Sequence, residues 1–303
     1  MLKVAWSPVY AHPLPEGHRF PMEKYNLIPE QLLYEGTISQ ANLFEPGPLA
    51  EADILTTHTA AYWEGLRSLS LSPREFRKIG FPPSPELIFR EIVIAQGTVD
   101  CARFARIHGI AMNVSGGTHH AYADRGEGFC LLNDIAIAAN VLLRDGLAQR
   151  ILVVDLDVHQ GNGTAAIFQG NPHVFTFSMH CHGNYPMEKE ASDLDIALPP
   201  GTGDAAFLGT LADTLPQLLA QFKPDFAFYL SGVDVLATDK LGRFAMTREG
   251  CKERDRLVLD SLRGAGIPVA VSMGGGYSVH VRDIVEAHCN TFRLAAAWAD
   301  ARF

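Results

Sequence analysis

The chain has 303 residues, of which 47% are hydrophobic and 19% are charged, and its formal net charge is −9. This composition is ordinary for a globular protein with a large buried core. Phosphate binding needs a basic surface, so the charge argues against nucleic acid as a partner. The charge would suit a cationic substrate, although an acidic surface most often serves solubility alone.

The sequence shows no export, membrane or linker signal. The first ten residues, MLKVAWSPVY, lack the basic start and apolar centre of a signal peptide, and no apolar run is long enough to cross a membrane. We therefore expect a cytoplasmic protein that makes no membrane contact. No linker or repeat divides the chain, so we expect one domain over residues 1–303, with no indication of its oligomeric state. The five cysteines are scattered without C-x-x-C spacing, which predicts reduced, mostly buried thiols.

Four segments share a short apolar run that ends abruptly in polar residues and glycines. They are GIAMNVSGGTHH (109–120), RILVVDLDVHQGNGT (150–164), FAFYLSGVDVL (226–236) and IPVAVSMGGGY (267–277). Continuous apolar runs are typical of strands buried on both faces. Helical patterns that end in glycine occur at 133–146 and 247–266. This alternation predicts an α/β fold with a central, mostly parallel sheet flanked by helices on both faces.

The polar residues that follow these runs should meet at one edge of the sheet. An open parallel sheet binds its ligand at the carboxyl ends of its strands, and each run turns polar at that end. The side chains expected to converge there are His119, His120, Asp155, Asp157, His159, Asp234 and Tyr277.

The DLDVH segment carries the strongest chemical signal. Asp155, Asp157 and His159 alternate along a segment expected to be extended, so all three side chains should point to one side. Three polar groups on a buried strand would be costly without a cation, and Asp234 is the natural further ligand. An Asp/His/Asp set leaves one position of a tetrahedral zinc open for water and substrate, as in catalytic sites. The alternative is that these residues only cap the next helix.

Four blocks resemble the signature segments of the histone deacetylase family, in the family's order and spacing. They are NVSGGTHHAYADRGEGFCLLND, VVDLDVHQGNGT, SGVDVLATDKLGRF and SMGGGY. The resemblance implies the arginase/deacetylase fold and a metal-dependent amidohydrolase. Its substrate would be an acyl-lysine in a peptide or protein, or a small acylated amine such as an acetylpolyamine. The resemblance leaves open whether zinc or ferrous iron is the metal.

The resemblance also implies a role for individual residues. The zinc ligands would be Asp157, His159 and Asp234, and the catalytic histidine pair would be His119 and His120, with His120 as general base and acid. Tyr277 would bind the substrate carbonyl. Asp155 would hold His119 and, with Ser178, would form part of a structural potassium site. The acyl-lysine tunnel would be walled by Gly128, Phe129, Tyr185 and Leu241.

One departure places the chain near the class IV branch of the family. Many members have a histidine and an aspartate where this chain has Gln160 and Asn162. The partner of His120 would then be an amide, which orients the imidazole but stabilises its cation less than a carboxylate would. We expect a weaker general base.

Two other functions are compatible with the same fold. A binuclear manganese ureohydrolase of the arginase type shares the fold, but it would need further carboxylates where this chain has Gly161 and Gly232. A catalytically inactive acyl-lysine binder would not need all of the metal and catalytic residues, and all are present. His180 and His182 flank Cys181 in a pattern that suggests a second metal site, but we assign them to a loop.

Overall fold

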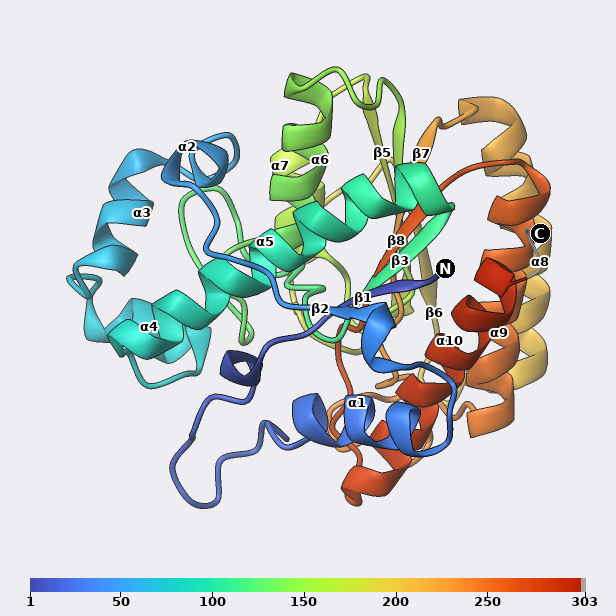
Figure 1. Cartoon of the computed structure of the whole chain (residues 1–303), viewed down its shortest axis with the longest axis horizontal. Coiled ribbons are helices and arrows are strands. Elements are labelled where there is room, and N and C mark those ends of the chain that lie inside the picture. Colours follow the sequence, from blue (N-terminus) through green and yellow to red (C-terminus); the bar gives the residue numbers. More distant parts are fainter. Residues whose placement is uncertain (301–303) are drawn as a thin grey trace.

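The computed structural model describes residues 1–300 as one α/β arrangement, drawn in Figure 1. The strands are β1 (Lys3–Ala5), β2 (Leu43–Phe44), β3 (Ile110–Asn113), β4 (Ile151–Asp155), β5 (Val174–Cys181), β6 (Leu194–Leu198), β7 (Phe226–Leu230) and β8 (Val269–Ser272). The α-helices are α1 (Lys24–Tyr34), α2 (Glu51–Ile54), α3 (Ala60–Arg67), α4 (Pro73–Ile79), α5 (Pro85–His108), α6 (Asp134–Arg144), α7 (Asn162–Phe168), α8 (Asp204–Phe222), α9 (Arg248–Gly264) and α10 (Val281–Asp300). Two 3-10 turns cover Pro8–Tyr10 and Gln40–Asn42.

All eight strands join one sheet in the order β2-β1-β3-β8-β7-β4-β5-β6, and every pairing among them is parallel. The four segments predicted from their apolar runs form the central strands β3, β8, β7 and β4. Every residue of these strands is buried, whereas exposure alternates along the edge strand β6. The prediction of a mostly parallel sheet is therefore confirmed. Strands β1, β2, β5 and β6 lie outside these four segments.

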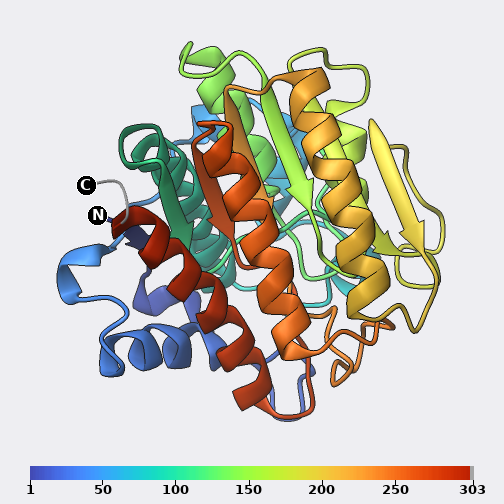
Figure 2. The ribbon, with the colours of Figure 1, turned by 90° about the vertical axis from the view of Figure 1, so that its right-hand side faces the viewer.

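Helices cover both faces of the sheet. Helices α5, α6 and α7 lie on one side of it in Figure 1, and α8, α9 and α10 lie on the other. Figure 2 shows these last three helices side by side over their face of the sheet. The predicted helices at 133–146 and 247–266 are present as α6 and α9, and each is followed within two residues by a glycine with positive φ, Gly146 and Gly266. This architecture is the predicted arginase/deacetylase fold.

The ends of several helices are fixed by side chains. Asn133 caps α6 by accepting a hydrogen bond from Ala136 N (3.0 Å), and its amide also contacts Ala121 O and Thr164 Oγ1. These contacts tie the start of α6 to the loop after β3. All five cysteines are buried and free, as predicted. Within residues 1–300, no helix combines the length and the apolar character that crossing a bilayer requires.

Candidate metal centre and catalytic cavity

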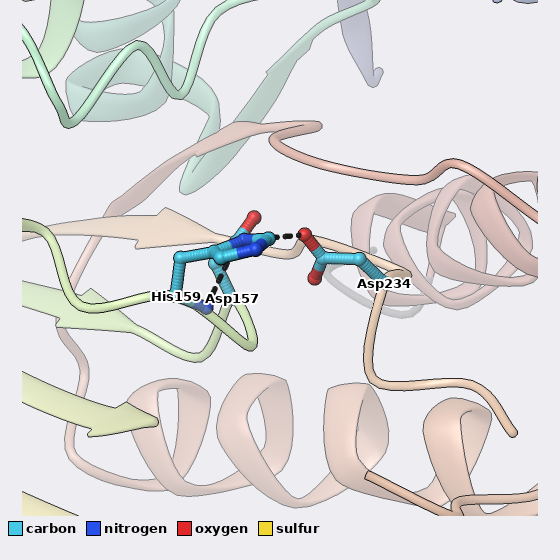
Figure 3. Close-up of side chains that lie close together, drawn as sticks. All are labelled: Asp157, His159 and Asp234. Carbon is cyan, nitrogen blue, oxygen red and sulfur yellow. Dashed lines mark hydrogen bonds and ion pairs between the residues drawn. The ribbon is translucent and has the colours of Figure 1, made fainter. Parts of the chain in front are cut away.

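The carboxyl ends of β4 and β7 bring three ligand groups together. Asp157 and His159 follow β4, and Asp234 follows β7, its hydrogen-bonded neighbour in the sheet. One atom from each residue lies within 4.8 Å of the others, and all three residues are buried. Figure 3 shows the side chains of His159 and Asp157 together, facing the carboxylate of Asp234. The His159 Nδ1 lies 2.9 Å from Asp157 Oδ1 and 3.1 Å from Asp234 Oδ2.

The charge of this cluster fits a bound cation. Burial lowers the pKa of His159, but the hydrogen bonds that Asp157 and Asp234 accept from it, together with their charges, outweigh burial and raise that pKa to about 10. Burial and the charge of Asp157 raise the pKa of Asp234 above its usual value. The two carboxylates thus require a positive charge between them. The donor set, two carboxylates and one imidazole, suits zinc or ferrous iron and leaves a coordination position for substrate.

The surrounding glycines leave no room for a second set of ligands. A Cβ atom at Gly161 would collide with Asp155 Oδ2, and one at Gly232 would collide with Asp157 Oδ2. These are the two positions where a binuclear ureohydrolase would need carboxylates. A side chain there would displace Asp155 or Asp157, so the geometry fits a single ion.

The segment after β4 is not extended, which corrects the sequence analysis. Strand β4 ends at Asp155, and the next residues bend because side-chain carboxylates accept hydrogen bonds from backbone N–H groups. Asp157 N donates to Asp155 Oδ1 (3.1 Å), and His159 N donates to Asp157 Oδ1 (2.9 Å). The period-two argument therefore fails beyond Asp155. Asp155 is not part of the three-residue cluster, and its Oδ2 contacts His119.

The two predicted catalytic histidines follow β3 and stand side by side, with ring centroids 4.1 Å apart. His119 Nδ1 lies 2.7 Å from Asp155 Oδ2. Burial lowers the pKa of His119, but Asp155 and Asp157 outweigh it, so that pKa is raised. The two carboxylates therefore favour the protonated form of His119.

His120 has the opposite electrostatic environment. Its Nδ1 lies 2.6 Å from Asn162 Oδ1, and the Asn162 amide donates to Tyr122 Oη (3.0 Å). Since Asn162 Oδ1 can only accept, Nδ1 of His120 carries the hydrogen and Nε2 is free to take a proton. Burial and the neighbouring His119 and His159 rings hold the pKa of His120 well below its usual value.

Tyr277 follows β8 and lines the same cavity as the histidines. Burial, together with Asp234 and Asp157, raises the pKa of its phenol well above the usual value, so the hydroxyl keeps its proton and remains a donor. Its loop is fixed by Asp239, which accepts from Tyr277 N (2.6 Å) and from Leu241 N (2.8 Å). Gly275 N of the same loop donates to Asp157 Oδ2 (2.9 Å).

A cavity of about 350 Å³ connects these groups with the surface. The four predicted tunnel residues all line it: Gly128, Phe129, Tyr185 and Leu241. Gly128 and Phe129 both have positive φ (54° and 67°), and a Cβ at Gly128 would lie 2.7 Å from His120 Cδ2. Glycine is needed there because the backbone of the wall approaches the His120 ring closely.

Ser178 lies in β5 directly opposite Asp155 of β4. Its hydroxyl is 3.0 Å from Nδ1 of His180, a buried ring whose pKa is lowered to about 4 by burial. The assignment of His180 to a loop is wrong, because β5 continues through Cys181 and the backbone pairs with β6. The apolar pattern of β5 is interrupted by Ser178 and His180, which concealed the end of this strand.

Sequence reasoning missed several residues that hold the site in place. The fully buried Arg254 of α9 donates to three backbone carbonyls beside the metal ligands, namely Leu156 O (3.1 Å), Gly232 O (2.6 Å) and Ser231 O (3.3 Å). Asp255 is its buried carboxylate partner, 2.7 Å away. In the sequence, the pair was concealed in the highly charged run KERDR, which is typical of a solvent-exposed helix face.

Asp134 at the start of α6 anchors the loop that carries the histidine pair. It accepts hydrogen bonds from Gly117 N (3.1 Å), Thr118 N (2.8 Å) and the Thr98 hydroxyl (2.6 Å). Asp134 is the last residue of a segment that resembles the family signature. Its role depends on contacts with α5 and β8, which the local sequence does not reveal.

Comparison with known proteins agrees with this geometry. A model of the histone deacetylase domain matches residues 18–292. The chain belongs to the histone deacetylase family.

The curated relatives span bacteria and plants. An uncharacterized protein of Picosynechococcus sp. (strain ATCC 27264 / PCC 7002 / PR-6) is 46% identical, over 96% of this chain and 97% of its own length. Histone deacetylase 2 of Arabidopsis thaliana is 28% identical, over 86% of this chain and 70% of its own length. The acetoin utilization protein AcuC of Staphylococcus aureus (strain MSSA476) is 29% identical, over 87% and 74% respectively.

Two solved structures share the fold. The HDA15 HD domain superposes with a TM-score of 0.84 at 20% identity, covering 98% of this chain and 88% of that one. An HDAC homologue complexed with SAHA also gives a TM-score of 0.84, at 24% identity, with 100% and 84% covered. At such low identity these likenesses establish the fold alone.

Proposed function

We propose that this protein is a zinc-dependent amidohydrolase that removes acetyl or longer acyl groups from the side-chain amine of lysine. The observation that carries the proposal is the buried Asp157/His159/Asp234 cluster at a cavity also lined by His119, His120 and Tyr277. Membership of the histone deacetylase family supports amide hydrolysis. The amide partner of His120 supports a place near the class IV branch.

Asp157, His159 and Asp234 would hold the metal. When bound, zinc would polarise the acyl carbonyl and lower the pKa of a water molecule. The remaining chemistry belongs to the side chains. Neutral His120 accepts a proton at Nε2 from the attacking water, and it returns that proton to the nitrogen of the leaving amine. The products are a free amine and a carboxylate.

Tyr277 and His119 would act on charge. The Tyr277 hydroxyl donates a hydrogen bond to the carbonyl oxygen as that oxygen gains negative charge. His119 is held by Asp155 at 2.7 Å, which favours its protonated form, and burial together with this neighbour lowers the pKa of His120 and favours its neutral form before reaction. The potassium ion proposed at Asp155 and Ser178 would stabilise the end of β4.

The cavity supports an acyl chain bound beyond the carbonyl. Phe20, Tyr25 and Ile94 also line it and add apolar wall. Each buried methylene of an acyl chain contributes about 0.8 kcal/mol. Room of this kind supports acceptance of acyl groups longer than acetyl.

The test compares hydrolysis and binding on one acetyl-lysine peptide. We expect the wild-type protein loaded with zinc to release free lysine, and His120→Ala to bind the peptide with near-complete loss of hydrolysis. Wild-type protein that binds the peptide and never releases the acyl group would instead be the inactive acyl-lysine binder. Hydrolysis of acetylputrescine in clear preference to the peptide would identify a polyamine deacetylase.

A further inference from the structure

The mouth of the cavity is basic, although the chain as a whole is acidic. Three exposed side chains from distant parts of the sequence line it: Arg19 before α1, Lys78 in α4 and Arg243 in the loop after β7. Among the described residues, the only carboxylate that lines the cavity is Asp157, which is buried among the metal ligands. The charge that a substrate meets at the entrance is therefore positive.

Two of these cations have no acidic partner within residues 1–300. The Arg19 guanidinium lies over the Phe129 ring, 5.0 Å from its centroid, and forms no ion pair there. The Arg243 guanidinium forms neither an ion pair nor a hydrogen bond with a described residue; only its backbone is held, by Asn184 Oδ1 (3.1 Å) and by Gly201. Both groups are free to bind an anion.

The third cation belongs to a group whose charges balance. Lys78 Nζ lies 3.5 Å from Glu127 Oε1. That same carboxylate also binds Arg125 Nε (3.2 Å) and accepts from the Tyr185 hydroxyl (2.5 Å). Arg125 is also paired with Asp124 (3.0 Å), so the two cations and two carboxylates of this group balance, and the positive charge of the mouth rests on Arg19 and Arg243.

The net charge of −9 does not cancel this local charge. The Debye length is about 8 Å at physiological ionic strength, so carboxylates elsewhere on the surface are screened from a group bound at the mouth. The side chains within a few ångströms determine what binds there. The entrance repels a polyamine and attracts a carboxylate.

We propose that the substrate carries a carboxylate next to its acylated amine, which Arg19 and Arg243 bind at the mouth while the acyl group enters the cavity. This inference rests on the proposed function and narrows its substrate class. Acidic residues flanking an acyl-lysine in a peptide supply that carboxylate, and so does the free carboxylate of a small acylated amino acid. Arg19 and Arg243 would recognise the carboxylate in either kind of substrate.

The test uses acetyl-lysine peptides flanked on both sides by Glu, Gln or Lys. At about 5 Å in water, one charge pair changes an equilibrium about fourfold, so two guanidinium contacts should favour Glu over Gln by about 16-fold at low salt. We expect this order in kcat/KM and in the Kd measured by fluorescence anisotropy, and we expect it to shrink below about threefold at 1 M salt. Equal values for the three peptides, or an advantage for Lys, would overturn the proposal.

Variants assign the effect to its residues. Arg19→Gln combined with Arg243→Gln should bring the Glu-to-Gln ratio close to one, and Arg243→Gln alone should lower it in part without disturbing Phe129. Arg106→Gln is the control, because this exposed arginine lies near the amino end of β3, at the opposite edge of the sheet from the site. An unchanged ratio in the double variant would contradict the assignment.

Further arms identify the source of the carboxylate and separate the two proposals. Nα,Nε-diacetyl-lysine should be favoured over its C-terminal amide, and a larger gain for the Glu-flanked peptide would identify a peptide as the source. Tighter binding of the Glu-flanked peptide without hydrolysis of any substrate would support the basic mouth and refute the proposed function. Hydrolysis of all substrates without any charge preference would refute only the proposed carboxylate recognition at the mouth.

Discussion

Replacing Asn162 by aspartate tests how this site sets the basicity of its general base. Asn162 Oδ1 lies 2.6 Å from Nδ1 of His120, and both side chains are buried. The present amide orients the ring and offers only a dipole to the imidazolium. Asn162→Asp would place a full negative charge at the same distance, with the same hydrogen bond retained.

The expected shift follows from that distance. A carboxylate within hydrogen-bond reach raises an imidazole pKa by about 1 to 3 units. Burial and the adjacent imidazoles hold the pKa of His120 well below its usual value in the native protein. Only the neutral ring accepts a proton, so raising this pKa moves the acidic limb of the pH–rate profile to higher pH by the same amount. The Tyr122 hydroxyl, which now donates to Glu190 (3.1 Å), can donate to the new carboxylate instead.

The assay is kcat/KM for one acetyl-lysine peptide across the acidic limb, with zinc held saturating. Asn171→Asp is the matched control, because Asn171 lies just before β5 and uses its side-chain oxygen to accept from His173 N, a bond that aspartate keeps. The control should leave the limb in place. A limb that stays or moves to lower pH in Asn162→Asp would refute the view that Asn162 tunes His120.

The other predictions concern the oxyanion donor, the metal ligands and the buried arginine. Tyr277→Phe should lower kcat roughly 100-fold with KM nearly unchanged, because the Tyr277 hydrogen bond forms mainly to the oxyanion. Steady-state kinetics measure both constants, and a rise in KM alone would assign Tyr277 to substrate binding instead. Asp234→Ala should abolish both stoichiometric zinc, measured by elemental analysis, and hydrolysis, because two ligands hold the ion too weakly; a full equivalent of zinc in this variant would remove Asp234 from the ligand set. Arg254→Lys should weaken zinc affinity about 10- to 100-fold in a chelator competition, because the backbone around the ligands loses its clamp. Arg256→Lys, on the exposed face of the same helix, should retain native affinity, and equal affinities in both variants would show that Arg254 serves folding alone.

The central sheet was predictable because its four middle strands are buried on both faces. Their sequences are continuous apolar runs that end at the polar residues of the site, so strand and site were visible in the same pattern. The outer strands are different. Strand β2 has two residues, β1 has three, and β6 alternates in exposure at the sheet edge, so their pairing depends on neighbours rather than on their own composition.

The residues of the metal cluster could be predicted from the sequence, but the backbone geometry around them could not. Adjacent parallel strands bring Asp157, His159 and Asp234 together, and the structure places all three in one cluster. The turn after Asp155 was not foreseen, because it arises from side-chain hydrogen bonds to backbone N–H groups.

The buried role of Arg254 and the charge at the cavity mouth could be recognised only once the fold was known. Arg254 resembles an exposed helical arginine until its contacts with Leu156 and Gly232 are known. The net charge of −9 suggested a cationic substrate, whereas Arg19 and Arg243 make the mouth basic. Total charge does not reveal which charges face the cavity.

The most direct test of a single-metal deacylase is a metal titration of activity. Protein stripped of metal by a chelator is titrated with zinc while hydrolysis of one acetyl-lysine peptide is followed. The Asp157/His159/Asp234 site predicts no activity at the start and a linear rise that ends at one zinc per chain. Full hydrolysis by the stripped protein, or a rise that ends only at two ions per chain, would contradict it.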